Sequence, residues 1–238
     1  MILHRAATSL RPLRRDRRAV ALLEFALSAP FVLALGLYGI EIANEALTHM
    51  RISQIALNLA DNASRVGVLG TTNVETLREG DINDILQAAR IQGSGIDLGV
   101  NGRVIISSLE NIQQSYDTAP VQRIHWQRCI GKQSGTGYTS SYGTTLVTDG
   151  TTTDKADKGT DQSAGMGDAN AKVSAPAGSG LIFVEVNYLY KPRVSRLITS
   201  PFRIHYTASL IVRNNRDFKK IDNLISPANR ATCNLYNA

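Results

Sequence analysis

The chain has 238 residues, of which 43% are hydrophobic and 19% are charged, and its formal net charge is +6. Residues 1–18 contain six arginines and a single aspartate, whereas the rest of the chain carries nearly equal numbers of basic and acidic residues. No aromatic residue lies among these arginines. The composition therefore argues against a nucleic-acid-binding surface and favours a membrane-topology signal.

An apolar run follows this basic leader, and between Ala19 and Ile40 its only charged residue is Glu24. As a helix, this run spans roughly 33 Å, enough to cross a hydrocarbon core of about 30 Å. Its many large apolar residues outweigh the insertion cost of one charge near the end of the run. We predict a basic cytoplasmic leader over residues 1–19 and a transmembrane helix over residues 20–42, with the remainder exported.

The helical pattern continues beyond the predicted span. Apolar residues recur at helical spacing from Ile52 to Val66, polar residues fill the opposite side, and Gly67 supplies a stop signal. We expect an amphipathic continuation over residues 43–66, so that one long helix runs from about Val20 to Val66. Pro30 lacks a backbone donor and is expected to kink the membrane half of this helix.

Residues 67–238 are predicted to form an exported α+β domain. Residues 71–80 are polar and predict a loop, and a short amphipathic helix follows, with Asp81 as its N-cap. Residues 131–180 are rich in Gly, Ser and Thr and poor in large apolar residues, which predicts a long loop unable to bury a core. Residues 218–225 suggest a final helical turn or two. Strands are expected at residues 104–109, 121–130, 181–190 and 201–214, and the last two pattern as antiparallel strands with one buried face.

The two cysteines, Cys129 and Cys233, both fall in the predicted exported domain. An even number of cysteines in an oxidising compartment predicts one disulfide, and two cysteines allow only one intramolecular pairing. The alternative is a pair of separate buried thiols.

The remaining polar residues form no recognisable catalytic or cofactor motif. The four histidines are scattered, without the spacing of a zinc site. The Gly-rich stretches after Gly131 fit neither a phosphate-binding nor a dinucleotide-binding loop, and the aspartates between Asp149 and Asp168 match no calcium loop. We therefore expect a non-enzymatic protein without a metal or other cofactor.

The leader and the apolar run together resemble the TadE-like minor pseudopilins of tight-adherence pili. The family signature is a small residue, four small or apolar residues, Glu-Phe-Ala, a proline about six residues on, and an acidic end to the span. Here it matches Ala19, residues 20–23, residues 24–26, Pro30 and Glu41. The stretch VEVNYLYKP looks like the family's alternating Val/Tyr strand before a Lys-Pro pair, and TASLIVRNNR resembles its closing strand.

This resemblance implies a pilin-like fold and a role in assembling a tight-adherence type IV pilus for adhesion or secretion. A prepilin peptidase would cut between Ala19 and Val20, although the family usually has glycine at the position of Ala19. The resemblance assigns Glu24, Phe25 and Pro30 to subunit assembly, with Glu24 pairing the new α-amine of a neighbouring subunit. Its implied partners are the inner membrane, the peptidase, other pilin and pseudopilin subunits and the assembly platform, without nucleic acid.

Three other interpretations remain open. Ordinary signal-peptidase cleavage after Ala34–Gly36 would release a secreted periplasmic binding domain. Without cleavage, the chain would be a membrane-anchored domain in which Glu24 snorkels beside Arg17 and Arg18. A membrane-anchored envelope enzyme is the least favoured, because no catalytic constellation is present. The mature N-terminus distinguishes the first two from pilin processing.

Overall fold

The computed structural model describes residues 17–70, 73–194 and 200–237. The chain divides into two compact units, which we describe separately. Unit 1 comprises Met1–Glu45 and Pro192–Ser200, and unit 2 comprises Ala46–Lys191 and Pro201–Ala238. The long helix α2, Arg17–Arg65, contributes its first part to unit 1 and its second part to unit 2. Most of the predicted leader lies outside the described residues.

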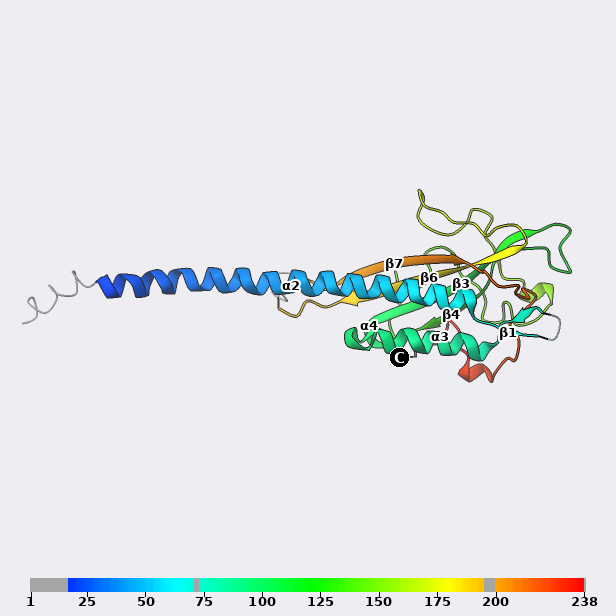
Figure 1. Ribbon diagram of the computed structural model, residues 1–238, viewed down its shortest axis with the longest axis horizontal. Coiled ribbons are helices and arrows are strands. Elements are labelled where there is room, and N and C mark those ends of the chain that lie inside the picture. The colour runs from blue at the N-terminus through cyan, green and yellow to red at the C-terminus, as the bar shows by residue number, and fades with distance from the viewer. Residues whose placement is uncertain (1–16, 71–72, 195–199, 238) are drawn as a thin grey trace, which may run out of the picture. The chain divides into compact units, whose positions relative to one another are not determined.

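Helix α2 confirms the expectation of one long N-terminal helix. The helix includes Pro30 without a break, and Figure 1 shows α2 as one ribbon. Its first part is long and apolar enough to cross a membrane, and the most apolar stretch is not buried. One candidate span near the N-terminus, counted over the residues that the structure describes, fits a single-pass membrane protein.

Unit 2 is built around a sheet whose strands are all antiparallel, in the order β5-β4-β3-β6-β7. The strands are β3 (Gly102–Ile112), β4 (Val121–Ile130), β5 (Thr160–Asp161), β6 (Ser179–Tyr190) and β7 (Phe202–Ile211). The smaller elements are β1 (Val68–Leu69), β2 (Glu75–Thr76), α3 (Glu79–Gln92), α4 (Leu98–Asn101) and the 3-10 turns at Ser94–Ile96, Lys155–Asp157 and Pro227–Asn229.

The second part of α2 and helix α3 cover one face of this sheet, which we call the helical face. The predicted apolar stripe from Ile52 to Val66 packs here, together with Ile82 and Leu86 of α3. Alternate residues of the strands meet them, Val104 and Val184 among others. The predicted amphipathic character of this part of α2 is therefore confirmed.

The opposite face of the sheet, which we call the distal face, is also covered, which corrects two predictions. Strands β3, β4 and β6 are buried along nearly their whole length, so β6 does not have the single buried face predicted for it. The cover is the Gly/Ser/Thr-rich segment 131–178, whose Met166 is fully buried against Leu109 and Phe183. This segment was predicted to bury no core.

The route of the chain explains why the segment is long. Strand β4 ends on one side of β3, and the next long strand, β6, pairs with the other side of β3. The connection has to pass from one side of β3 to the other, and its residues Met166 and Ala175 pack on the distal face. A few apolar side chains are enough to cover this face, because Met166 and Ala175 belong to the same buried cluster as the apolar strand residues, which are Leu109, Ile124, Leu181 and Phe183.

Three local predictions were wrong. Helix α3 begins at Glu79, and Asp81 lies inside its first turn rather than at the N-cap. The carboxylate of Asp81 accepts bonds from the backbone N–H and the guanidinium of Arg78, which lowers the pKa of Asp81. Residues 71–80 are not all loop, because they include β2 and the start of α3. Residues 218–225, all described, contain no helical turn.

Candidate functional site

The first part of α2 presents an apolar surface in which Glu24 is the only acid between Val20 and Ile40. Val20, Glu24, Phe25 and Pro30 are all exposed, and the side chain of Ala19 lies outside the described residues. Within the described part of the chain, no hydrogen bond or ion pair reaches the carboxylate of Glu24. A surface of this kind suits lipid or other apolar helices, and its single acid has no partner among the described residues.

A second acid, Glu41, ends the apolar stretch, and its environment is the opposite. Glu41 is buried within unit 1, where its carboxylate accepts a bond from the backbone N–H of Arg193 at 3.0 Å and one from Val194 at 2.7 Å. Backbone N–H groups are well suited to hold an ionised carboxylate away from water. The end of the apolar stretch is thereby tied to the residues that follow the Lys191-Pro192 pair.

The predicted disulfide between Cys129 and Cys233 is present, with a Cα–Cα distance of 4.8 Å. It joins β4 to the last residues of the chain, which also pair with this strand through backbone bonds. Cys129 donates to the carbonyl of Ala231 at 2.6 Å, and Gly131 donates to that of Asn237 at 2.7 Å. The C-terminal segment, residues 231–237, is therefore fixed along the edge of β4.

Arg103 of β3 adds a third attachment to the same segment. Its guanidinium donates to the carbonyl oxygens of Gly131, Leu235 and Cys233 at 2.9, 2.7 and 2.6 Å. The ring of Tyr236 lies 4.4 Å from the guanidinium carbon. This role could not be predicted from the sequence, because Arg103 binds carbonyl oxygens, which any residue can supply.

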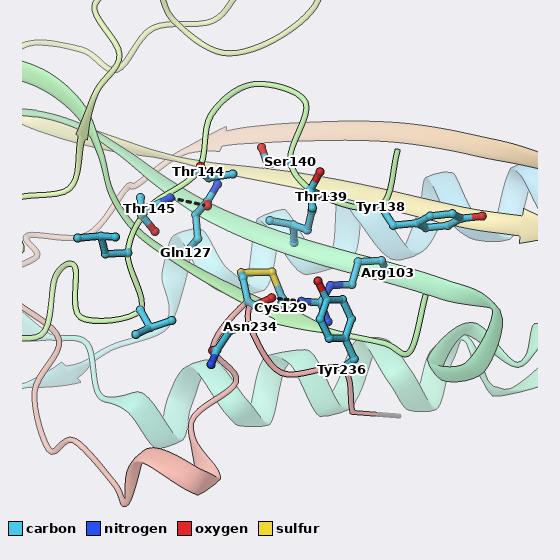
Figure 2. Close-up of a pocket in the computed structure, with 14 residues that line it drawn as sticks. Arg103, Gln127, Cys129, Tyr138, Thr139, Ser140, Thr144, Thr145, Asn234 and Tyr236 are labelled. Atoms are coloured by element: carbon cyan, nitrogen blue, oxygen red, sulfur yellow. Dashed lines mark hydrogen bonds between the residues drawn. A yellow bond between two sulfur atoms is a disulfide. The ribbon is translucent and has the colours of Figure 1, made fainter. Parts of the chain in front are cut away.

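A cavity of about 220 Å³ opens beside this attachment, entirely within unit 2 (Figure 2). Its wall combines Arg103 of β3, the Cys129–Cys233 disulfide and Gln127 of β4 with hydroxyl-bearing residues of segment 131–178. In Figure 2, Arg103 and Tyr236 lie on one side of the disulfide, whereas Thr144 and Thr145 lie beyond Gln127. The cavity therefore brings a buried cation, the disulfide and several hydroxyl-bearing residues together in unit 2.

Several buried polar groups nearby serve the fold. Glu79 of α3 and Arg128 of β4 form a fully buried pair on the helical face. Glu110 accepts a bond from Ser108 at 2.7 Å and contacts Nδ1 of His125 at 2.7 Å. Because the hydroxyl of Ser108 is directed at the carboxylate and not at the imidazole, these three residues do not form a nucleophile–base pair.

On the distal face, burial raises the pKa of Glu185, whose carboxylate is held by the hydroxyl of Ser140 at 2.5 Å and the backbone N–H of Ser141 at 3.0 Å. These bonds attach segment 131–178 to β6. Among the described residues, no three His, Cys, Asp or Glu side chains gather in a way that could hold a metal ion.

Comparison of the chain with protein-family models, with curated proteins and with solved structures gives no match. The resemblance to TadE-like proteins therefore depends on the motif residues themselves.

Proposed function

We propose that the chain is a TadE-like minor pseudopilin that takes part in assembling a tight-adherence type IV pilus for adhesion or secretion. In this proposal it crosses the inner membrane once, with its N-terminus in the cytoplasm and unit 2 in the periplasm, and it is not an enzyme. A prepilin peptidase removes residues 1–19, and the processed helix joins other pilin and pseudopilin subunits at the assembly platform.

The observation that carries the proposal is the carboxylate of Glu24, which is exposed on an apolar helix and unpartnered within the described chain. A charge at the centre of a membrane helix costs about 2.5–3.5 kcal/mol on insertion scales, and less near the end of the span. Cleavage before Val20 creates a positive α-amine at the depth of this carboxylate. Pairing between the amine of one subunit and Glu24 of the next removes an uncompensated charge and fixes the register of the two helices.

The surroundings of Glu41 give independent support. The resemblance drew on two distant stretches of sequence, the acidic end of the span and the Lys-Pro pair after the Val/Tyr strand. Within unit 1, the carboxylate of Glu41 binds the backbone directly after Lys191-Pro192. The acidic end of the span and the Lys-Pro pair therefore occur together for a physical reason, because the carboxylate of Glu41 holds the backbone that follows Pro192.

The test compares Glu24→Gln with Glu45→Gln in cells that make the pilus. Glu45 lies on the same helix, beyond the predicted span, and serves as the matched control. We expect Glu24→Gln to abolish or strongly reduce piliation while the protein stays in the membrane, and Glu45→Gln to leave piliation unchanged. Normal pili with Glu24→Gln would contradict the proposal.

Sequencing the N-terminus of the membrane-extracted protein provides the second arm. The proposal expects Val20 as the first residue. Met1 would indicate an uncut anchor, and Leu37 would indicate ordinary signal-peptidase cleavage within α2.

A second candidate function is an exported binding domain unrelated to pili, either anchored or secreted. The cavity beside Arg103 favours it, because the domain then has a ligand site of its own. Normal piliation with Glu24→Gln, together with Met1 or Leu37 at the N-terminus, would support this candidate.

A further inference from the structure

Arg103 is a buried cation without a carboxylate partner. Its side chain belongs to a residue that is only 2% exposed, and within the described residues no Asp or Glu forms an ion pair with it. Burial lowers the pKa of Arg103, although a guanidinium stays charged in proteins. A buried charge normally has an opposite charge beside it, because an unpaired one is costly to desolvate.

The hydrogen bonds of Arg103 leave part of its donor capacity unused. A guanidinium has five N–H donors. Both on Nη1 and one on Nη2 are directed at the three carbonyl oxygens of Gly131, Leu235 and Cys233. The Nε–H and the second Nη2–H have no hydrogen-bond partner among the described residues, and Arg103 lines the cavity.

The rest of the wall presents hydroxyl groups. Tyr138, Thr139 and Thr145 contribute side-chain oxygens that make no hydrogen bond to another described residue. Leu146 and the disulfide supply apolar surface between them. A wall with a single cation and several hydroxyl-bearing residues suits a ligand with one negative charge and several hydroxyl groups of its own.

We propose that this cavity binds the uronic acid residue of an acidic glycan. The carboxylate takes the free donors of Arg103, since the planar guanidinium matches carboxylate geometry, and the sugar hydroxyls bond the threonine and tyrosine oxygens. The volume of about 220 Å³ is below that of sites for drug-sized ligands and fits a single sugar residue. This proposal does not depend on pilus assembly, because the cavity lies wholly in unit 2.

The test titrates the full chain in detergent micelles with D-glucuronate, and with D-glucose, acetate and inorganic phosphate as comparison probes, by calorimetry or NMR. We expect glucuronate to bind at least about 10-fold more tightly than glucose, the loss expected when a charge-assisted hydrogen bond is missing. Acetate, which lacks the hydroxyls, should also bind more weakly than glucuronate. Equal affinities for glucuronate and glucose, tighter binding of phosphate, or no binding of glucuronate would overturn the proposal.

Two variants locate the binding at the cavity. Leu146 is 66% exposed at the wall, so Leu146→Trp fills the opening without disturbing a buried position. Ile91 is 63% exposed on α3 and does not line the cavity, so Ile91→Trp is the matched control. We expect Leu146→Trp to weaken glucuronate binding about 10-fold or more and Ile91→Trp to leave it unchanged. Unchanged binding by Leu146→Trp would place the ligand elsewhere and refute the assignment.

The third test of glucuronate binding replaces Arg103 itself. Arg103→Gln also removes attachments of the C-terminal segment, so its unfolding midpoint is measured alongside binding. Where the variant is folded, the preference for glucuronate over glucose should disappear. A folded variant that keeps the preference would contradict the role of the guanidinium.

Discussion

Replacing Glu79 with glutamine tests how firmly helix α3 is held on the sheet. The two oxygens of Glu79 accept bonds from Nε and Nη2 of Arg128 at 2.6 and 2.8 Å, and both side chains are 0% exposed. The remaining guanidinium nitrogen, Nη1, donates to the carbonyl of Gln127 at 2.8 Å. The pair is therefore bidentate and fully desolvated, and neither charge has water to replace its partner.

The expected loss follows from this geometry. Breaking a buried pair by removing one partner costs about 3–5 kcal/mol, because the other charge stays buried and uncompensated. Glutamine keeps one acceptor oxygen, so we expect Glu79→Gln to fall near the lower end of this range. The double variant Glu79→Leu with Arg128→Met removes both charges and keeps the volume, and it should lie within about 1–2 kcal/mol of the wild type.

The assay is urea unfolding of the full chain in detergent micelles, followed by tryptophan fluorescence. Trp126 is the only tryptophan, and it is buried on the helical face two residues before Arg128 on β4. Asp61→Asn is the control, because Asp61 and Arg65 form an exposed pair expected to contribute about 0.5 kcal/mol or less. A cost below about 1 kcal/mol for Glu79→Gln, or a double variant as unstable as the single one, would refute this reasoning.

Three further predictions use the same unfolding measurement. Cys129→Ser with Cys233→Ser opens a loop with a sequence separation of 104, which should lower the free energy of unfolding by about 4–5 kcal/mol, and an unchanged midpoint would contradict this. Met166→Ala should cost about 2–5 kcal/mol, whereas a negligible loss would show that segment 131–178 does not pack as described. Burial lowers the pKa of His125, but the charge and hydrogen bond of Glu110 outweigh it and raise the pKa above 6.5. The interaction of protonated His125 with Glu110 should therefore stabilise the fold fully below pH 6.5, and this contribution should be lost as the pH rises through the raised pKa of His125. The variant His125→Gln should remove this pH dependence of the free energy of unfolding.

Elements with a strong local pattern were predictable from the sequence. Helix α2 was expected over residues 20–66 and is found at Arg17–Arg65, and the strand expected at 121–130 is β4. In α2 the apolar residues first run continuously and then recur at helical spacing, so the local signal extends over many residues. Strand β4 lacks a regular alternation and was predicted from its residue types alone. The disulfide was predictable because two cysteines in a domain predicted to be exported leave a single pairing.

The cover of the distal face was not predictable in this way. Its core contribution is confined to a few positions, such as Met166 and Ala175, in a segment that otherwise resembles solvent-exposed loop. Whether such residues are buried depends on the order of strands in the sheet, which places β6 beside β3 and sends the connection across the face. Strand order is set by contacts between distant residues and leaves no local period in the sequence.

The candidate sites also differ in whether a local sequence signal reveals them. Glu24 stands out in the sequence, because a carboxylate among apolar residues violates the local pattern. Arg103 and the partners of Glu41 do not stand out, since each acts through backbone groups far along the chain. A charged residue that binds carbonyl or N–H groups has no complementary side chain to reveal it.

Two of the acids in unit 1, Glu24 and Glu41, differ in whether their own chain compensates the charge within the described residues, and this difference decides what each can do. Glu41 is satisfied by backbone N–H groups of its own chain, so changing it should disturb the segment after Pro192 in every copy of the protein, assembled or not. Glu24 has no partner within the described residues, and under the proposed function its charge is compensated only when a neighbouring subunit supplies an α-amine. In the proposed pilus, Glu24 is therefore the acid that can distinguish a helix docked against a neighbouring subunit from a helix alone in lipid, and assembly defects that spare the fold should map to it.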